Sequence, residues 1–240
     1  IHNLNSSGVN FVESRVPSSS KTQFEWKQYY SSEYQFKKTT TYLSPLKLVS
    51  AHQFGSRHTV MALNKHADYL PVYQNLLNQG FDITHYISYL KPEEAITIYP
   101  EWFELDSQNT QFHLLQGIPQ FDLIHEINQK YDFALMLYND EFEGIFCMYN
   151  QMKYATGSRI FAYIAAGIPI IISSCTESLA DIIREFQIGI VVNSKERKNL
   201  LQVIQQYDYQ QMLYNMSKAQ KHYSLENNIG RLRDFLKERI

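Results

Sequence analysis

A guanidinium and several small hydroxyl side chains flank one apolar run in the sequence. Arg159 stands near the start of the segment SRIFAYIAAGIPIIISSCTES, after Ser158, and Ser174 and Thr176 stand near its end. A guanidinium can form bidentate hydrogen bonds with a phosphate, and hydroxyls can bond phosphate or sugar oxygens. These residue types predict a site for a phosphorylated ligand, provided that the fold brings the two ends of the run together.

The run itself predicts a helix, a tight turn and a buried strand. Residues 158–166 place their large apolar side chains on one face, so this helix should pack on a sheet, with Ser158 as its N-terminal cap. Gly167 suits the left-handed residue that ends a helix, and Pro169 can begin a strand without losing a needed ladder hydrogen bond. IPIII is therefore expected to be a central strand, and SSCTES the loop at its carboxyl end.

That loop should lie on the ligand side of the sheet, because open parallel sheets bind ligands beyond the carboxyl ends of their strands. Ser174-x-x-Glu177 and Ser178-x-x-Asp181 both match a capping box, which predicts a helix over about 177–187 that begins in the loop. Its free N–H groups and positive dipole end would favour an anion such as phosphate.

The rest of the chain alternates strand-like and helix-like segments. LKLVSAH, FDITHYISYL, TQFHLLQGIP, YDFALMLYN and IGIVVN predict strands, and runs such as QFDLIHEINQK predict amphipathic helices between them, while EEAITIYPEWFEL is ambiguous. This pattern indicates an α/β fold, a Rossmann-like doubly wound parallel sheet with helices on both faces, over residues 45–240. Residues 1–44 are expected to be a linker or the remnant of a preceding domain, and a first residue other than Met suggests a piece of a longer protein.

Composition argues against several classes of function. The chain has 22 basic and 24 acidic residues in 240, so its net charge of -2 offers no footprint for nucleic acid or an anionic membrane. Cys147 and Cys175 lack the spacing of a disulfide framework or a zinc site, so no metal is expected. The longest apolar run is interrupted by charge, glycine and proline, so no integral membrane segment is expected, and a cytoplasmic location fits best.

The blocks GSRIFAYIAAGIPIIISS and ESLADIIREFQIGIVVN, in this order, resemble the C-terminal, nucleotide-sugar-binding domain of GT-B glycosyltransferases. In that family a basic residue, an aromatic-containing helix, Y-L-A-A-G-x-P-V-I and E-I-I-x-x-x-x-x-G-x-V-V recur. TQFHLLQGIPQFDLIHEINQK is similar to the strand, G-x-V-P and helix that precede them. The resemblance covers about residues 45–193. It implies two facing Rossmann-like domains, of which this chain is the donor-binding half, with the acceptor domain N-terminal to it or on a partner subunit.

The resemblance also implies roles for particular residues. Arg159 matches the basic residue that can approach the donor diphosphate, and Arg57 is similar in position to residues that hold the pyrophosphate, with Gly55 allowing close backbone approach. Glu143 is expected to enter the cleft. The expected donor-binding residues are Gly55, Ser56, Arg57, Glu143, Thr156, Ser158, Arg159, Ser174, Thr176 and Glu177.

The carboxylates depart from the family pattern. Many retaining members carry two glutamates, the second standing five positions before the A-A-G glycine, where this chain has Ala162. No catalytic residue can therefore be assigned, and the retaining or inverting outcome stays open. His52 and His58 could relay a proton or bond a phosphate, or they could be ordinary surface residues.

The resulting hypothesis is a glycosyltransferase domain of polysaccharide biosynthesis, with no cofactor. It would bind a nucleotide diphosphate sugar for transfer to a glycan or glycoconjugate acceptor. The isolated chain would be inactive if it needs an acceptor domain. Two alternatives stay open: a nucleotide-sugar epimerase of the same architecture, and a non-catalytic GT-B-like module, which the Ala162 departure favours.

Overall fold

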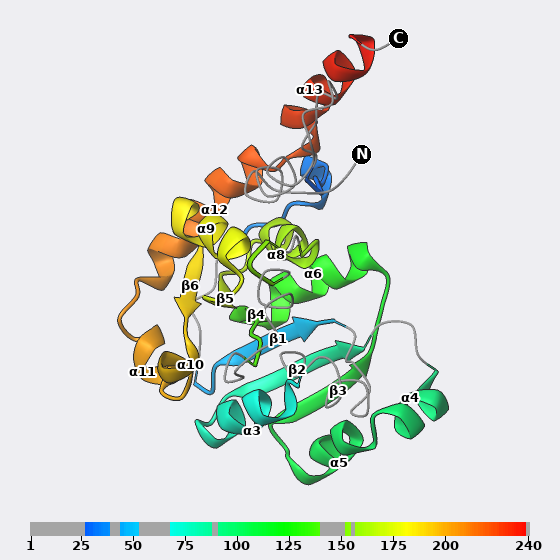
Figure 1. Ribbon diagram of the computed structural model, residues 1–240, viewed down its shortest axis with the longest axis vertical. Helices are drawn as coiled ribbons and strands as arrows, with labels where there is room; N and C mark the ends of the chain where they lie inside the picture. The colour runs from blue at the N-terminus through cyan, green and yellow to red at the C-terminus, as the bar shows by residue number, and fades with distance from the viewer. Residues whose placement is uncertain are drawn as a thin grey trace, which may run out of the picture.

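The computed structural model describes residues 27–38, 44–52, 68–87, 91–139, 152–154 and 157–238. These residues form a six-stranded sheet in the order β3-β2-β1-β4-β5-β6, and every neighbouring pair of strands is parallel (Figure 1). The strands are β1 Lys47–Ala51, β2 Asp82–Ile87, β3 Phe112–Gln116, β4 Phe133–Met136, β5 Ile170–Ser173 and β6 Gly189–Val192. The expected Rossmann-like parallel sheet is confirmed.

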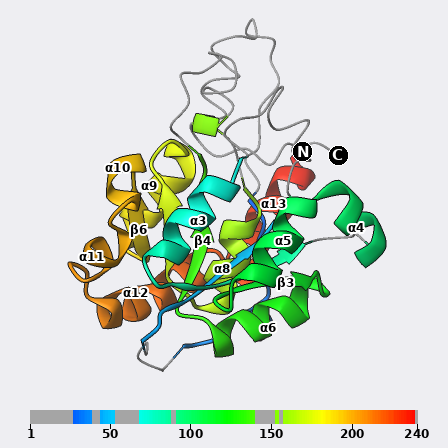
Figure 2. The same cartoon turned by 90° about the horizontal axis from the view of Figure 1, so that it is seen from below.

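Helices connect the strands and cover both faces of the sheet. Figure 2 shows α10, α11 and α12 gathered at the β6 end and α4 and α5 at the β3 end. The segment EEAITIYPEWFEL, which was ambiguous from sequence, forms two helices, because Pro92 and Pro100 each occupy a first turn, where a missing N–H costs little. The helices are α3 Leu70–Asn78, α4 Pro92–Ile98, α5 Pro100–Gln108, α6 Gln120–Lys130, α8 Arg159–Ala166, α9 Glu177–Phe186, α10 Ser194–Arg197, α11 Leu200–Ile204, α12 Tyr209–His222 and α13 Leu225–Lys237, with the 3-10 turn η1 at Ser32–Tyr34.

The core has two layers because the strands are apolar on both faces. Leu48 of β1 packs in a cluster with α3, α5 and α11, whereas its neighbour Val49 packs with α6, α8 and α9. Helix α12 contributes Met212 to the first layer and Met216 to the second. It therefore passes around the β6 edge of the sheet.

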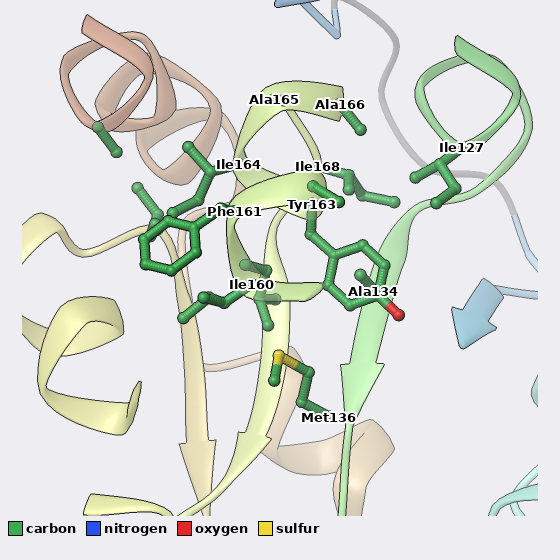
Figure 3. Packing of buried hydrophobic residues seen from close by; sticks show 14 of the residues in the cluster. Ile127, Ala134, Met136, Ile160, Phe161, Tyr163, Ile164, Ala165, Ala166 and Ile168 are labelled. Atoms are coloured by element: carbon green, nitrogen blue, oxygen red, sulfur yellow. The ribbon is translucent and has the colours of Figure 1, made fainter. Parts of the chain in front are cut away.

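Helix α8 and the turn before β5 form as the sequence predicts. The buried face of α8 packs in one cluster with Ala134 and Met136 of β4 (Figure 3). Gly167 ends the helix with a φ of 72°, in the left-handed region, and a side chain there would overlap the carbonyl oxygen of Phe36. The chain then enters β5, where Ile171 pairs with Leu135 of β4.

Residues 27–38, within the stretch expected to be a linker or remnant, are bound to this domain. The backbone N–H of Phe36 donates to the carbonyl of Ala165 at the end of α8 (2.8 Å), and the N–H of Leu225 donates to the carbonyl of Tyr30 (2.9 Å). The segment therefore joins the C-terminal end of α8 to the first turn of α13.

Candidate functional site

Strands β1 and β4 stand where the strand order reverses. Strand β1 is paired with β2 along its whole length, but it is paired with β4 only at Leu48 and Val49. In doubly wound sheets the ligand binds at this switch point, outside the carboxyl ends of the strands. The carboxyl ends of β1, β4 and β5 therefore define the candidate site.

Two side chains replace the ladder hydrogen bonds that β1 and β4 do not make at this end. The backbone N–H of Ala51 donates to the hydroxyl of Tyr163 on α8 (3.1 Å). The hydroxyl of Ser50 donates to the carbonyl of Leu135 on β4 (3.4 Å). Figure 3 shows the Tyr163 ring extending from α8 towards β4, close to Ala134. Helix α8 is thereby fixed to the end of β1.

Arg159 lies one helical turn before Tyr163, so their side chains share one face of α8. Burial raises the pKa of the Tyr163 hydroxyl, and the nearby charge of Arg159 opposes that rise. Burial opposes the charge of Arg159, but the oxygens of four nearby tyrosines favour it, and the net effect raises its pKa. These are Tyr138, Tyr163, Tyr69 and Tyr73. Within the described part of the chain, no carboxylate forms an ion pair with Arg159.

Two buried histidines support the end of β1. His85 donates from Nε2 to the carbonyl of His52 (2.9 Å) and accepts at Nδ1 from the hydroxyl of Tyr73 (2.8 Å). Burial lowers the pKa of His85 to about 3. The Nδ1 atom of His52 lies 2.8 Å from the hydroxyl of Ser50. Burial first, and then the charge of Arg159, hold the pKa of His52 well below its usual value, so both rings are neutral at pH 7.

The loop after β5 lies at the same edge as Arg159. Burial is the main cause of the raised pKa of Tyr69, and both Arg159 and Cys175 also act on this hydroxyl. The start of α8 and the β5 loop therefore lie around one tyrosine. The ring centroids of Tyr69 and Tyr138 are 5.8 Å apart, which brings the end of β4 into the same group.

The backbone of Tyr138 is held from two sides. Its N–H donates to the hydroxyl of Ser173 at the end of β5 (2.9 Å), and its carbonyl accepts from the buried Arg197 (2.7 Å). These contacts tie the ends of β4 and β5 to α10. The position of Tyr138 beside Tyr69 thus depends on side chains from two separate elements, β5 and α10.

The capping interactions that the sequence predicted are not formed in the structure. Ser158 makes no side-chain cap on α8, and neither proposed capping box forms at α9. Helix α9 begins after Thr176, whose hydroxyl donates to the carbonyl of Ser173 instead (2.8 Å). Ser178 is buried within the helix. These cap predictions were wrong, and the first turn of α9 has no side-chain cap.

The predicted donor-binding residues fall into three groups. Arg159 and the loop that contains Thr176 lie at the switch-point edge. Ser158 is exposed, Ser174 lies beside β6, and Glu177 forms a 2.9 Å ion pair with Lys153. The remaining five lie outside the described residues: Gly55, Ser56, Arg57, Glu143 and Thr156.

Sequence reasoning missed the residues that position Arg159. Ser50, Tyr69 and Tyr138 carry no motif of their own. Their shared signal is their location, because each stands at or just beyond a strand end or at a helix start. Tyr163 is the tyrosine of the Y-I-A-A-G-I-P block, so the family resemblance marked its position, while its spacing of four residues after Arg159 indicated the shared helix face.

Two other kinds of feature are absent from the described residues. No helix there combines the length and apolar character needed to cross a bilayer. No group of three or more His, Cys, Asp or Glu side chains in the same residues could hold a metal ion.

Comparison with known proteins identifies the same architecture. Residues 77–226 match the family described as "Glucosyltransferase 3-like, C-terminal domain". No curated protein matches the sequence. Among solved structures, an E. coli trehalose-6-phosphate protein bound with UDP-2-fluoro glucose is similar at 11% identity and a TM-score of 0.51, over 80% of this chain and 43% of that one. A UDP-forming α,α-trehalose-phosphate synthase from Burkholderia xenovorans, in complex with glucose-6-phosphate, is similar at 9% identity and a TM-score of 0.50, over 81% and 43%.

At such low sequence identity, these similarities show a shared fold and nothing more. The chain spans less than half the length of either enzyme. Its six-stranded sheet with flanking helices corresponds to one half of a GT-B architecture.

Proposed function

Because the chain belongs to the Glucosyltransferase 3-like, C-terminal domain family, we propose that it binds a nucleotide diphosphate sugar for transfer to a glycan or glycoconjugate acceptor. The donor diphosphate would lie at the carboxyl ends of β1, β4 and β5. Arg159 would be its main ligand among the described residues. The acceptor-binding part would be supplied outside the described domain.

The observation that carries this proposal is the electrostatic setting of Arg159. A partly buried guanidinium normally has a carboxylate partner, because an isolated buried charge is costly. Arg159 instead faces tyrosine oxygens and a neutral histidine, and no carboxylate of the described chain pairs with it. An anionic ligand would supply the missing charge, and a diphosphate matches the planar fork of arginine.

Helix α9 supports the same reading. Its ten residues begin at this edge of the sheet, and no side chain caps its first turn. Free N–H groups and the dipole at a helix start favour a negative ligand. Glu177 is the nearest opposing charge, and its ion pair with Lys153 reduces its effect.

The chemistry follows from this placement. When the bond between the anomeric carbon and the diphosphate breaks, negative charge builds on the leaving diphosphate. A fixed guanidinium and a helix start would stabilise that charge more in the transition state than in the ground state. The described residues thus account for departure of the nucleotide, and the acceptor would be activated elsewhere.

The test is thermal protection of the chain by UDP, GDP, ADP and TDP. We expect one of these diphosphates to raise the melting temperature, and Arg159→Ala to remove most of that rise. Arg233→Ala, which changes an exposed arginine on α13, is the matched control and should retain it. If no diphosphate protects a folded wild-type chain, or if Arg159→Ala is protected equally, the proposal fails.

A sugar-nucleotide that binds can then be tested for turnover with the full-length protein. Transfer that requires an added acceptor supports a glycosyltransferase. Interconversion of the donor without any acceptor would instead identify an epimerase.

A further inference from the structure

A cavity lies along the free edge of the sheet, and Arg159 is not part of its lining. It has a volume of about 590 Å3 and is bordered by β6, α9 and the chain from α10 to α12. Small-molecule sites commonly have volumes of roughly 300–1,000 Å3. Ser174 and Gln187 are both part of its lining.

The backbone of β6 presents hydrogen-bonding groups to this cavity. Ile188 and Val192 direct their carbonyls to β5, where they accept from Ile170 and Ser174. Because alternate residues of a strand face opposite neighbours, Gly189 and Val191 direct their N–H and carbonyl groups to the other side. Both residues line the cavity and are partly exposed, and β6 has no further neighbour in the described sheet.

The opposite wall carries polar side chains that internal hydrogen bonds hold in place. Asp208 accepts from the N–H of Gln211 (3.0 Å), and Glu196 accepts from the N–H of Asn193 (2.9 Å). Each of these bonds uses one carboxylate oxygen and leaves the other for a ligand. The side-chain amide of Gln211 donates to Asn215 (3.1 Å), which leaves the Gln211 carbonyl oxygen as a further acceptor.

An aromatic ring completes the lining. Tyr207 stands between α11 and α12, and 44% of its surface is exposed. A tyrosine ring offers an apolar face together with a polar hydroxyl. A sugar has the matching character, because its C–H groups form an apolar face and its hydroxyls both donate and accept.

We propose that this cavity is a carbohydrate-binding site for a neutral mono- or disaccharide unit of a glycan. The sugar would lie against Tyr207 and direct its hydroxyls to Asp208, Glu196 and the backbone of Gly189 and Val191. Carboxylate, amide and backbone groups on facing walls suit a polyol better than an extended peptide, whose side chains would need apolar pockets. The strand is also only four residues long, which limits its use as a pairing edge.

Sugar binding at this site needs neither a nucleotide nor Arg159. Its role, to hold a glycan that the protein extends or has released, rests on the proposed function. A sugar should therefore bind in the absence of any nucleotide, whichever way the diphosphate experiment turns out.

The experiment is amide NMR on the whole chain during titration with glucose, N-acetylglucosamine and lactose. We expect at least one sugar to shift the amide signals of Gly189 and Val191. Tyr207→Ala should weaken the binding of that sugar by about tenfold or more. The lost ring contact and the lost hydroxyl together should contribute more than about 1.4 kcal/mol to the binding free energy. Gln211→Ala should weaken it as well. Tyr214→Ala, which removes a more exposed tyrosine of α12 outside this cavity, is the control and should bind normally.

Amide shifts that are confined to the β6 edge and are lost in Tyr207→Ala would support the site. Unshifted Gly189 and Val191 signals with all three sugars would overturn it, as would equal binding by Tyr207→Ala and the control. A short unstructured peptide that shifts these signals where the sugars do not would also overturn it, in favour of strand addition.

Discussion

The backbone N–H of Ala51 donates a hydrogen bond to the hydroxyl of Tyr163, which reaches it from α8. At this position the ladder between β1 and β4 has already ended, so a side chain takes the place of a strand. The charge of Arg159 acts on the same hydroxyl and opposes the rise in its pKa that burial causes. One phenol therefore both holds α8 to the end of β1 and forms part of the polar surroundings of the guanidinium.

Tyr163→Phe should destabilise the fold and weaken the candidate site together. The ring would still fill its place, but the N–H of Ala51 would be buried without an acceptor, which costs roughly 1–3 kcal/mol. Urea unfolding measures this loss, and diphosphate protection measures the effect on Arg159. Tyr214→Phe, at an exposed tyrosine, should change neither. Unchanged stability in Tyr163→Phe would show that water or another group replaces the hydroxyl.

Gly167→Ala should be much more harmful than Gly80→Ala. Both glycines have positive φ, so each substitution forces alanine into the left-handed region at a cost of roughly 1 kcal/mol. Only at Gly167 would the new methyl group also meet the backbone of Phe36, whereas the space beside Gly80 is open. The clash should raise the total cost at Gly167 to roughly 3 kcal/mol. Melting temperatures of the two variants compare them directly, and equal values would contradict the close approach of residues 27–38.

His85 should make the protein less stable in acid. Its folded pKa of about 3 lies below the ordinary value of 6.5, so the unfolded chain takes up this proton first. Stability is therefore full above about pH 6.5 and is lost as the pH falls from there towards 3. The loss from His85 alone should reach about 2 kcal/mol between pH 7.5 and pH 5.

His85→Gln should reduce this dependence on pH, because it removes the titrating ring. His52, whose pKa burial also lowers, keeps some of the dependence. Urea unfolding at the two pH values measures the difference. A His85→Gln variant with an unchanged slope would contradict the neutral, buried state of His85.

Glu226→Gln should loosen residues 27–38 from α13. The Glu226 carboxylate accepts from the hydroxyl of Ser31 (2.7 Å) and, with both oxygens, from the N–H of Ser32 (3.0 and 3.2 Å). The hydrogen bond from Ser31, followed by the one from the Ser32 N–H, lowers its pKa to about 2. A carboxamide offers only one acceptor oxygen, so hydrogen exchange at the Ser32 amide should become faster, on the order of tenfold. Glu93→Gln, at an exposed first-turn glutamate of α4, should leave that rate unchanged.

The sequence was most informative where one local pattern determines the outcome. The helix over 158–166, the left-handed Gly167 and the strand that follows depend on neighbouring residues, and they formed as expected. The cap predictions failed although they were also local. A cap needs a hydroxyl oxygen placed to accept from a helix N–H, and the spacing of residues does not determine that placement. Ser158 and Thr176 stand directly before their helices without making such a bond.

The environment of Arg159 could not be predicted in the same way. Tyr69, Tyr138 and Tyr163 come from three elements whose contact depends on strand order and register. The spacing of residues in the sequence determines neither the strand order nor the register. The cavity beside β6 was missed for the same reason, because Tyr207 and Gly189 become neighbours only when α12 passes around the sheet edge.

The side-chain amide of Gln220 donates to three carbonyls at once, those of Phe36, Ile164 and Ala165. A single residue of α12 thus satisfies carbonyls at the end of α8 and holds residues 27–38 against that end. Across evolutionary relatives, this amide and the segment should be inherited as a unit. A lineage that loses one would need another donor for the carbonyls at the buried end of α8, so substitutions at these positions should occur together.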